Sequence, residues 1–241
     1  MPRLQIPTLA TLLLVLAGLV LWCGAGAAAE DPAEMKLELK KGDFILFFGD
    51  SLTALAGKEE PKEHVTKGYV RIVRETLQEM HKDKDLKVGW VATGGHKVTD
   101  LLKRVDADVL AQKPTVVFVQ IGVNDANAGV TPEMFKAQLE ELIGKLQKGG
   151  AKVVLCTCTC RVEGYKADNA FDKKLDALAD AARAIAKEKK LPLNDLRKAF
   201  IAYWKEHNPD NKPKGFLTYD GNHWTEKGHK YVAEQMLKKF K

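Results

Sequence analysis

From residue 41 to the end of the chain, short apolar runs alternate with longer segments whose apolar residues recur at helical spacing. The runs have the length and composition of strands and lie at residues 44–48, 86–91, 115–121 and 151–155, with at best a short edge strand at 191–193. The run at 115–121 is apolar almost throughout, which is typical of a parallel strand covered on both faces. This alternation predicts one three-layer α/β domain, an α/β/α sandwich with a mostly parallel sheet.

Helices are expected between these runs. Val73 and Leu77 follow helical spacing, and Pro132 is well placed to open a helix that Gly149-Gly150 closes. The predicted helices cover residues 69–81, 98–111, 132–148, 169–189, 195–206 and 225–241. No internal repeat and no domain linker interrupts this stretch.

The start of the chain has the layout of an export signal. Arg3 supplies a positive charge, residues 4–29 carry no charge, and the stretch ends in small residues that form an A-x-A cleavage site. Cleavage after Ala29 would leave Glu30 as the mature N-terminus. We therefore expect an exported protein, periplasmic or extracellular.

Two alternatives to cleavage follow from the same residues. The apolar run is long enough to span a bilayer, so residues 4–29 could remain as an anchor. A lipoprotein ranks below both, because Trp22 stands where a small residue should precede Cys23. The expected division is a signal at 1–29, an N-terminal extension at 30–40 and the α/β domain at 41–241, with no stable membrane insertion of the mature domain.

The formal charge of +6 comes from lysines scattered among glutamates along the helices. This pattern favours a solvated surface, and no nucleic-acid signature accompanies it. Nucleic acid is therefore not expected as a partner.

Three cysteines alternate with threonines in Cys156-Thr157-Cys158-Thr159-Cys160. If the strand before them continues, all three sulfurs point to one face, roughly 6.5–7 Å apart, which is poor disulfide geometry. Packing as small hydrophobes is favoured over a soft-metal site, because no second Cys or His group stands at ligand spacing.

Chemistry-bearing residues gather where the predicted strands end, which is where sites lie in open α/β sheets. Ser51, the only serine of the chain, follows the first strand in Gly49-Asp50-Ser51. It is a candidate nucleophile, or it merely caps the next helix. The base that a nucleophilic serine needs is best supplied by His223, because Asp220 lies three residues earlier and one loop can then present imidazole and carboxylate together.

Two further strand ends offer hydrogen-bond donors for an oxyanion. Gly95 permits close approach of its backbone N–H, and the Asn124 side-chain amide is a neutral donor. Each signal is weak by itself, since Gly95 could mark a turn and Asn124 a turn or cap.

Taken together and in this order, the four segments closely resemble the SGNH hydrolases, also called the GDSL esterase/lipase family. The matching blocks are Gly49-Asp50-Ser51-Leu52, the segment 93–102, Gly122-Val123-Asn124-Asp125 and Asp220-Gly221-Asn222-His223. The second block departs from the usual pattern: Trp90 and Ala92 replace an upstream Asn and Gly, and His96 follows the glycine where an acidic or amide residue is common.

The resemblance implies a five-stranded parallel sheet flanked by helices in the flavodoxin-like order. It also implies acyl transfer through Ser51, His223 and Asp220, with an oxyanion hole made by the backbone N–H groups of Ser51 and Gly95 and by the Asn124 side chain. No metal or cofactor is required. We expect Trp224, which follows the implied catalytic histidine, to pack in the core.

The substrate is left open by these motifs. The family includes carbohydrate deacetylases, lysophospholipases and thioesterases. No long apolar lid or added binding module is visible, which favours a short acyl group, and export favours a glycan ester. We expect an esterase for short-chain esters, acetyl esters of carbohydrates in particular. The alternatives are a lysophospholipase or short-chain lipid esterase, and a carbohydrate-binding relative without turnover, against which the intact blocks argue.

Overall fold

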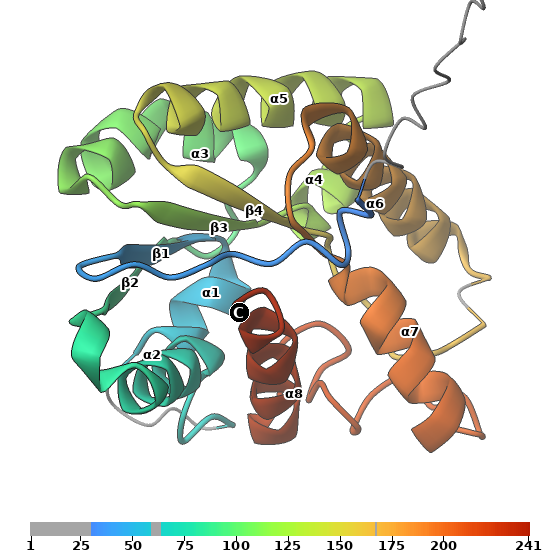
Figure 1. The fold of residues 1–241 in the computed structure, drawn as a ribbon. Coiled ribbons are helices and arrows are strands. Elements are labelled where there is room, and N and C mark those ends of the chain that lie inside the picture. Colours follow the sequence, from blue (N-terminus) through green and yellow to red (C-terminus); the bar gives the residue numbers. More distant parts are fainter. Residues whose placement is uncertain (1–29, 59–63, 167) are drawn as a thin grey trace, which may run out of the picture.

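The computed structural model describes residues 30–58, 64–166 and 168–241. Its centre is a five-stranded sheet in the order β2-β1-β3-β4-β5, with every neighbouring pair parallel (Figure 1). The strands are β1 (Phe44–Gly49), β2 (Lys87–Ala92), β3 (Val116–Gln120), β4 (Lys152–Cys156) and β5 (Leu193–Asn194). This is the flavodoxin-like order, so the predicted fold class is confirmed.

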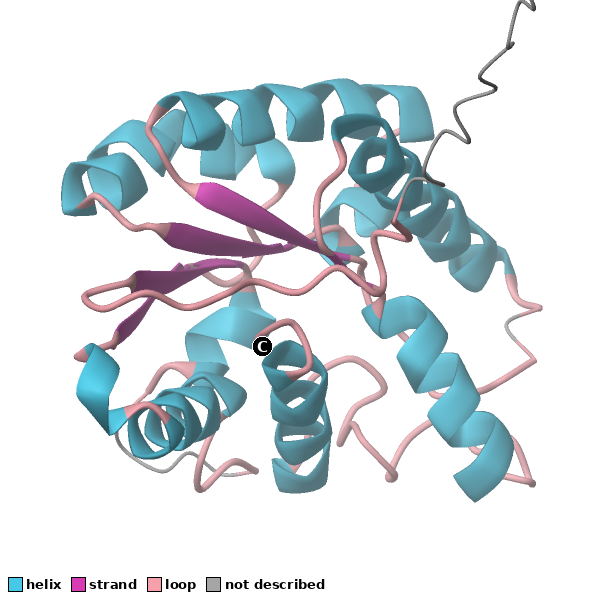
Figure 2. Ribbon diagram, viewed as in Figure 1, coloured by secondary structure: helices cyan, strands magenta, loops and turns pink. Residues whose placement is uncertain are grey.

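Helices cover both faces of the sheet, as Figure 2 shows. They are α1 (Ser51–Ala56), α2 (Tyr69–Met80), α3 (Val98–Arg104), α4 (Val123–Asn127), α5 (Pro132–Lys148), α6 (Ala170–Lys189), α7 (Leu196–His207) and α8 (Glu226–Leu237). Side chains alternate along a strand, so β1 serves two cores. Leu46 and Phe48 pack with α3, α4, α5 and α6, whereas Ile45 and Phe47 pack with α1, α2, α7 and α8.

Most predicted elements are confirmed, and the differences have local causes. The helix predicted over 98–111 is regular only to Arg104 and continues as a π-helical turn, Val105–Val109, and a 3₁₀ turn, Leu110–Gln112. The last helix ends at Leu237 rather than at the C-terminus, because the residues after it run beside the N-terminal segment. Two short helices, α1 and α4, were not predicted.

Residues 30–40 pack against the domain by backbone contacts at one edge of the sheet. Leu37 and Phe240 form a parallel bridge, and both side chains are buried. The backbone N–H of Leu193 in β5 donates to the carbonyl of Pro32 at 2.8 Å. The predicted signal at 1–29 lies outside the described residues, and within the described ranges no helix is long and apolar enough to cross a membrane.

The prediction that the three cysteine sulfurs share one face is wrong. It assumed that the strand continues, but β4 ends at Cys156. Cys156 and Cys160 pack in the core beneath α2 and α8, whereas Cys158 packs in the opposite core and its thiol donates to the Leu175 carbonyl at 3.4 Å. All three thiols are free, and burial raises their pKa values. No metal-binding group of three or more ligands occurs in the part of the chain that the structure describes.

Candidate active site

Ser51 lies at the carboxyl edge of the sheet, two residues after the end of β1. Gly49 ends β1 where a Cβ atom would lie 2.5 Å from the Gln120 carbonyl, so only glycine fits there. Asp50 then caps α1, and its Oδ1 accepts from the Leu52 backbone N–H at 3.0 Å. The helix cap is therefore Asp50, and the interpretation of Ser51 as the capping residue is wrong. Ser51 occupies the first helical position and leaves its hydroxyl for another partner.

That partner is His223, which the structure brings to Ser51 together with Asp220. Ser51 Oγ lies 3.1 Å from His223 Nε2, and His223 Nδ1 lies 2.7 Å from Asp220 Oδ2. The other carboxylate oxygen, Oδ1, accepts from the backbone N–H groups of Asn222 at 2.9 Å and His223 at 2.7 Å. Partial burial works to raise the pKa of Asp220, but these hydrogen bonds, led by that of the His223 ring, hold it below its usual value. Asp220 is thus a charged acceptor that fixes the ring.

The other predicted oxyanion residues lie on the loop after β2, which contains Gly95, and in α4, which contains Asn124. Gly95 has a φ of +80°, a conformation that favours glycine. A Cβ atom on the adjacent Gly94 would lie 3.8 Å from the Ser51 Cβ, so this loop passes beside the serine. The Asn124 side-chain Nδ2 donates to the His96 carbonyl at 3.0 Å. An amide nitrogen carries two hydrogens, so Asn124 keeps a second donor.

Two buried carboxylates support these segments, and sequence reasoning missed both roles. Asp125, in α4, accepts from the Val98 backbone N–H at 3.1 Å and so joins the third block to the second. Burial raises the pKa of Asp125 to about 6 and, with help from the charge of Asp125, raises the pKa of Asp50 to about 7. Each carboxylate also has one buried Oδ2 without a hydrogen-bond partner among the described residues. The aspartate next to Ser51 and the aspartate next to Asn124 are sequence signals for a helix cap or for a hydrogen bond between segments.

Tyr219 and Trp224, the aromatic residues on either side of the Asp220–His223 segment, lie in different surroundings. Trp224 is fully buried and packs edge-on against Tyr69, so the expectation of a core role is confirmed. His64 is exposed, as its charged segment indicates, and its ring stacks on Tyr219 with centroids 4.1 Å apart. Tyr219 in turn stacks on the His223 ring at 5.9 Å. This contact could not be predicted from the sequence, because His64 and Tyr219 are far apart along the chain.

Several known proteins are similar to this chain, two of them over most of its length. An acetylxylan esterase of Geobacillus stearothermophilus is 26% identical over 217 residues, which are 84% of this chain and 95% of that protein. The esterase TesA of Pseudomonas aeruginosa is 27% identical over 111 residues, 46% of this chain and 52% of its own. The solved structure of an acetyl xylan esterase called AlAXEase superposes with a TM-score of 0.74 at 32% identity, covering 80% of this chain and 98% of that one.

The family model for the GDSL-like lipase/acylhydrolase family matches residues 47–231. That stretch begins inside β1 and ends inside α8, so it contains all four motif segments. The chain therefore belongs to the GDSL-like lipase/acylhydrolase family, the SGNH hydrolases, and is a carboxylic ester hydrolase.

Proposed function

We propose that this esterase removes short acyl groups, acetyl above all, from carbohydrates by a Ser-His-Asp acyl-enzyme mechanism. The observation that carries the proposal is the continuous relay from Ser51 Oγ through the His223 ring to Asp220, with contacts of 3.1 and 2.7 Å. Both contacts have the length that proton transfer and ring orientation require.

The relay defines the first chemical step. With its carboxylate held charged, Asp220 accepts the hydrogen of His223 Nδ1, which leaves Nε2 as the basic nitrogen facing Ser51. His223 takes the proton of Ser51 as Oγ attacks the ester carbonyl carbon, and Asp220 stabilises the imidazolium that forms. The same proton then passes to the leaving alcohol as the ester bond breaks.

The oxyanion of each tetrahedral intermediate is bound by donors from three segments: the backbone N–H groups of Ser51 and Gly95 and the second Nδ2 hydrogen of Asn124. In the second step His223 removes a proton from water, the hydroxide adds to the acyl-serine, and the acid leaves as Ser51 recovers its proton. No step in this scheme needs a redox change.

The choice of an acetylated carbohydrate rests on the relatives. Two of the proteins that match nearly throughout their own length are named acetylxylan esterases. His96 adds a local argument, because it directly follows Gly95 and its carbonyl accepts from Asn124 Nδ2 at 3.0 Å, which places it beside the proposed oxyanion donors. We assign the His96 side chain to a hydroxyl of the sugar, since a site built on such a partner discriminates strongly against esters that lack it.

Export belongs to the same proposal. A charge-free apolar stretch ending in small residues precedes the domain, and polysaccharide esters lie outside the cytoplasm. We propose that residues 1–29 direct export and are removed near Ala29, with retention as an anchor by residues 4–29 as the alternative.

An acyl-length series tests the substrate. The kcat/KM of acetyl esters should exceed that of octanoyl esters, and acetylated xylo-oligosaccharides should release acetate, with Ser51→Ala as the inactive control. A preference for chains of eight or more carbons, or for lysophospholipids, would overturn the acetyl-carbohydrate proposal and favour a lipid esterase.

A further inference from the structure

Asp220 and His223 lie on residues 213–224, here called the catalytic loop, which has little secondary structure of its own. Residues 157–163, here called the supporting loop, hold it in place. A bridge between Thr218 and Trp224 closes the base of the catalytic loop. The supporting loop follows β4 and contains Glu163, a carboxylate that is only 1% exposed. Because burying a carboxylate is costly, its hydrogen-bond partners identify what the burial achieves.

The Glu163 carboxylate accepts hydrogen bonds from three successive backbone N–H groups. Phe216 donates to Oε2 at 2.8 Å, Leu217 donates to Oε1 at 2.6 Å, and Thr218 also donates to Oε1. Hydrogen bonds from backbone N–H groups to a charged acceptor are roughly twice as strong as neutral ones. A single side chain therefore fixes three consecutive residues that end two positions before Asp220.

The supporting loop also contacts the segment between the two members of the relay. Gly221 has a φ of +98°, and a Cβ atom there would lie 2.6 Å from the Arg161 carbonyl. The Gly221 N–H donates to Thr218 Oγ1 at 3.1 Å. The Glu163 backbone N–H donates to the Pro213 carbonyl at 2.8 Å. Residues 161–163 thus hold the catalytic loop at its start, at Thr218 and directly beside Asp220.

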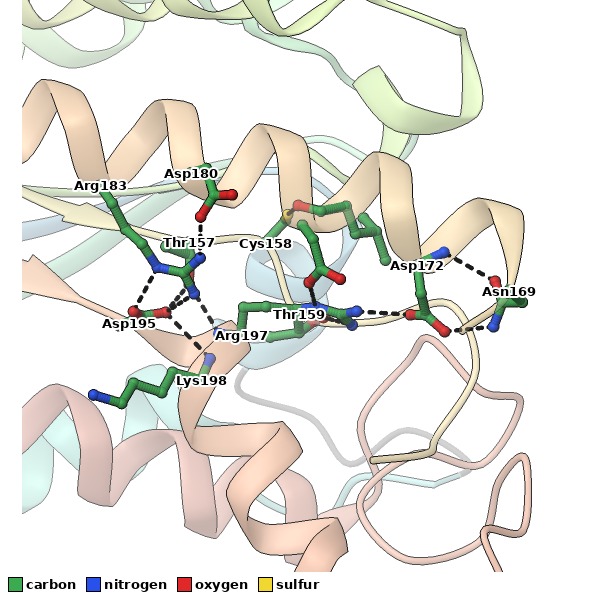
Figure 3. Close-up of polar contacts among 12 residues, drawn as sticks. Thr157, Cys158, Thr159, Asn169, Asp172, Asp180, Arg183, Asp195, Arg197 and Lys198 are labelled. Atoms are coloured by element: carbon green, nitrogen blue, oxygen red, sulfur yellow. Dashed lines mark hydrogen bonds and ion pairs between the residues drawn. The ribbon is translucent and has the colours of Figure 1, made fainter. Parts of the chain in front are cut away.

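The supporting loop is itself fixed to the core by Arg197, whose side chain is buried. Figure 3 shows its guanidinium group contacting Asp172 on α6. Arg197 Nη1 donates to the Thr159 carbonyl at 2.9 Å, and its backbone N–H donates to Thr157 Oγ1 at 2.8 Å. Ion pairs to Asp172 at 2.9 Å and to Asp176 at 2.7 Å hold the guanidinium on α6. Arg197 thus joins α6 to the supporting loop, and Glu163 joins the supporting loop to the segment before Asp220.

We propose that Glu163 is a positioning residue for catalysis: it sets the place of the Asp220–His223 pair relative to Ser51. The inference rests on the proposed function of that relay. A shift of Thr218 moves Asp220 and hence the His223 ring, whose Nε2 must stay within hydrogen-bond distance of Ser51 Oγ. A misplacement of about 1 Å can cost about 10²-fold in rate.

The test compares Glu163→Gln and Glu163→Ala with the unaltered protein, using p-nitrophenyl acetate turnover and the rate at which a fluorophosphonate labels Ser51. Glutamine keeps one oxygen acceptor for Leu217 and Thr218, whereas alanine removes every acceptor. Glu163→Ala should lower kcat about 10²-fold with little change in KM, and labelling should slow in parallel. Glu163→Gln should lie between alanine and glutamate.

Asp43→Asn is the matched control. Asp43 is also a buried carboxylate that accepts a backbone N–H, from Lys40 at 2.7 Å, but it lies before β1 at the opposite end of the sheet. The Asp43→Asn substitution should lower the Tm and leave kcat and the rate of Ser51 labelling unchanged.

The inference is overturned if folded Glu163→Gln labels and turns over at the unaltered rate, or if Asp43→Asn loses as much kcat. Should Glu163→Ala fail to fold, the glutamine variant decides. His223→Ala distinguishes failure of the proposed function from failure of the positioning role. If His223→Ala stays active, the proposed relay is wrong. If His223→Ala is inactive and Glu163→Gln is unaffected, only the positioning role of Glu163 is wrong.

Discussion

Replacing Asp50 with asparagine should stabilise the protein at pH 8, although Asp50 directly precedes the nucleophile. Asparagine caps a helix as well as aspartate does, so the hydrogen bond from the Leu52 N–H to Oδ1 is retained. What disappears is a carboxylate that is 1% exposed and whose second oxygen has no hydrogen-bond partner among the described residues.

The magnitude follows from the pKa of Asp50. Burial first, then the charge of Asp125, raises it from 3.8 to about 7. Between these values the folded protein holds a proton that the unfolded chain has released, so stability falls as pH rises from about 4 to about 7. Each pKa unit corresponds to 1.36 kcal/mol, which gives a loss of about 4 kcal/mol above pH 7. Asp50→Asn should recover up to this amount at pH 8 and nothing below about pH 4.

Urea unfolding at several pH values between about 4 and 8 measures the effect, with Asp83→Asn as an exposed control. The unaltered protein should lose stability over this range, and Asp50→Asn should show a flatter profile. Two other buried groups change the stability in opposite directions below about pH 6.5: Asp125, whose pKa is raised to about 6, costs stability as pH rises, whereas His229, whose pKa burial lowers to about 4, contributes stability as pH rises. Both groups are present in the two proteins, so the difference between the two profiles reports Asp50. The reasoning is refuted if Asp50→Asn is less stable than the unaltered protein at pH 8, or if the difference in stability between the two proteins does not grow as pH rises.

Four other predictions concern the relay and the N-terminus. A fluorophosphonate should label Ser51 alone, and Ser51→Ala should abolish turnover; normal turnover would exclude this nucleophile. His223→Ala should lose most activity because no base remains, and Asp220→Ala should lose less because the base survives. Asn124→Ala should lower kcat about 10²–10³-fold, the usual cost of removing one oxyanion donor, and an effect confined to KM would indicate substrate positioning instead. Sequencing of exported protein should begin just after Ala29; a full-length chain in the membrane fraction would indicate an anchor.

The sheet could be predicted from the sequence because buried parallel strands are nearly continuous apolar runs. The run at 115–121 contains β3, and the first predicted strand differs from β1 by one residue. The short helices α1 and α4 could not be predicted, because six and five residues do not complete two helical turns. In Gly49-Asp50-Ser51 either polar residue can cap a helix, and the sequence alone does not distinguish Asp50, which is the cap, from Ser51.

The motif residues of the site could be predicted because their chemistry is local and they stand at strand ends. Glu163 could not, because its partners are 53 to 55 residues away and no pattern marks it. The opposite packing of Cys158 depended on where β4 ends, which the alternating cysteines and threonines did not indicate. Long-range contacts such as those of Glu163, and the end of a strand where no glycine or charged residue marks it, are what this sequence leaves undetermined.

The contact between the N-terminal segment and β5 bears on how the edge of the sheet is covered. An exposed edge strand offers unpaired N–H and carbonyl groups to another chain. Here β5 has only two residues, and the N–H of Leu193 is already bound to the Pro32 carbonyl at 2.8 Å. Because proline has no N–H of its own, the covering segment cannot extend the ladder further at that position. The N-terminal segment thus seals an edge at which a second molecule could otherwise add a strand, and trimming it back beyond Pro32 would open the sheet to edge-to-edge aggregation.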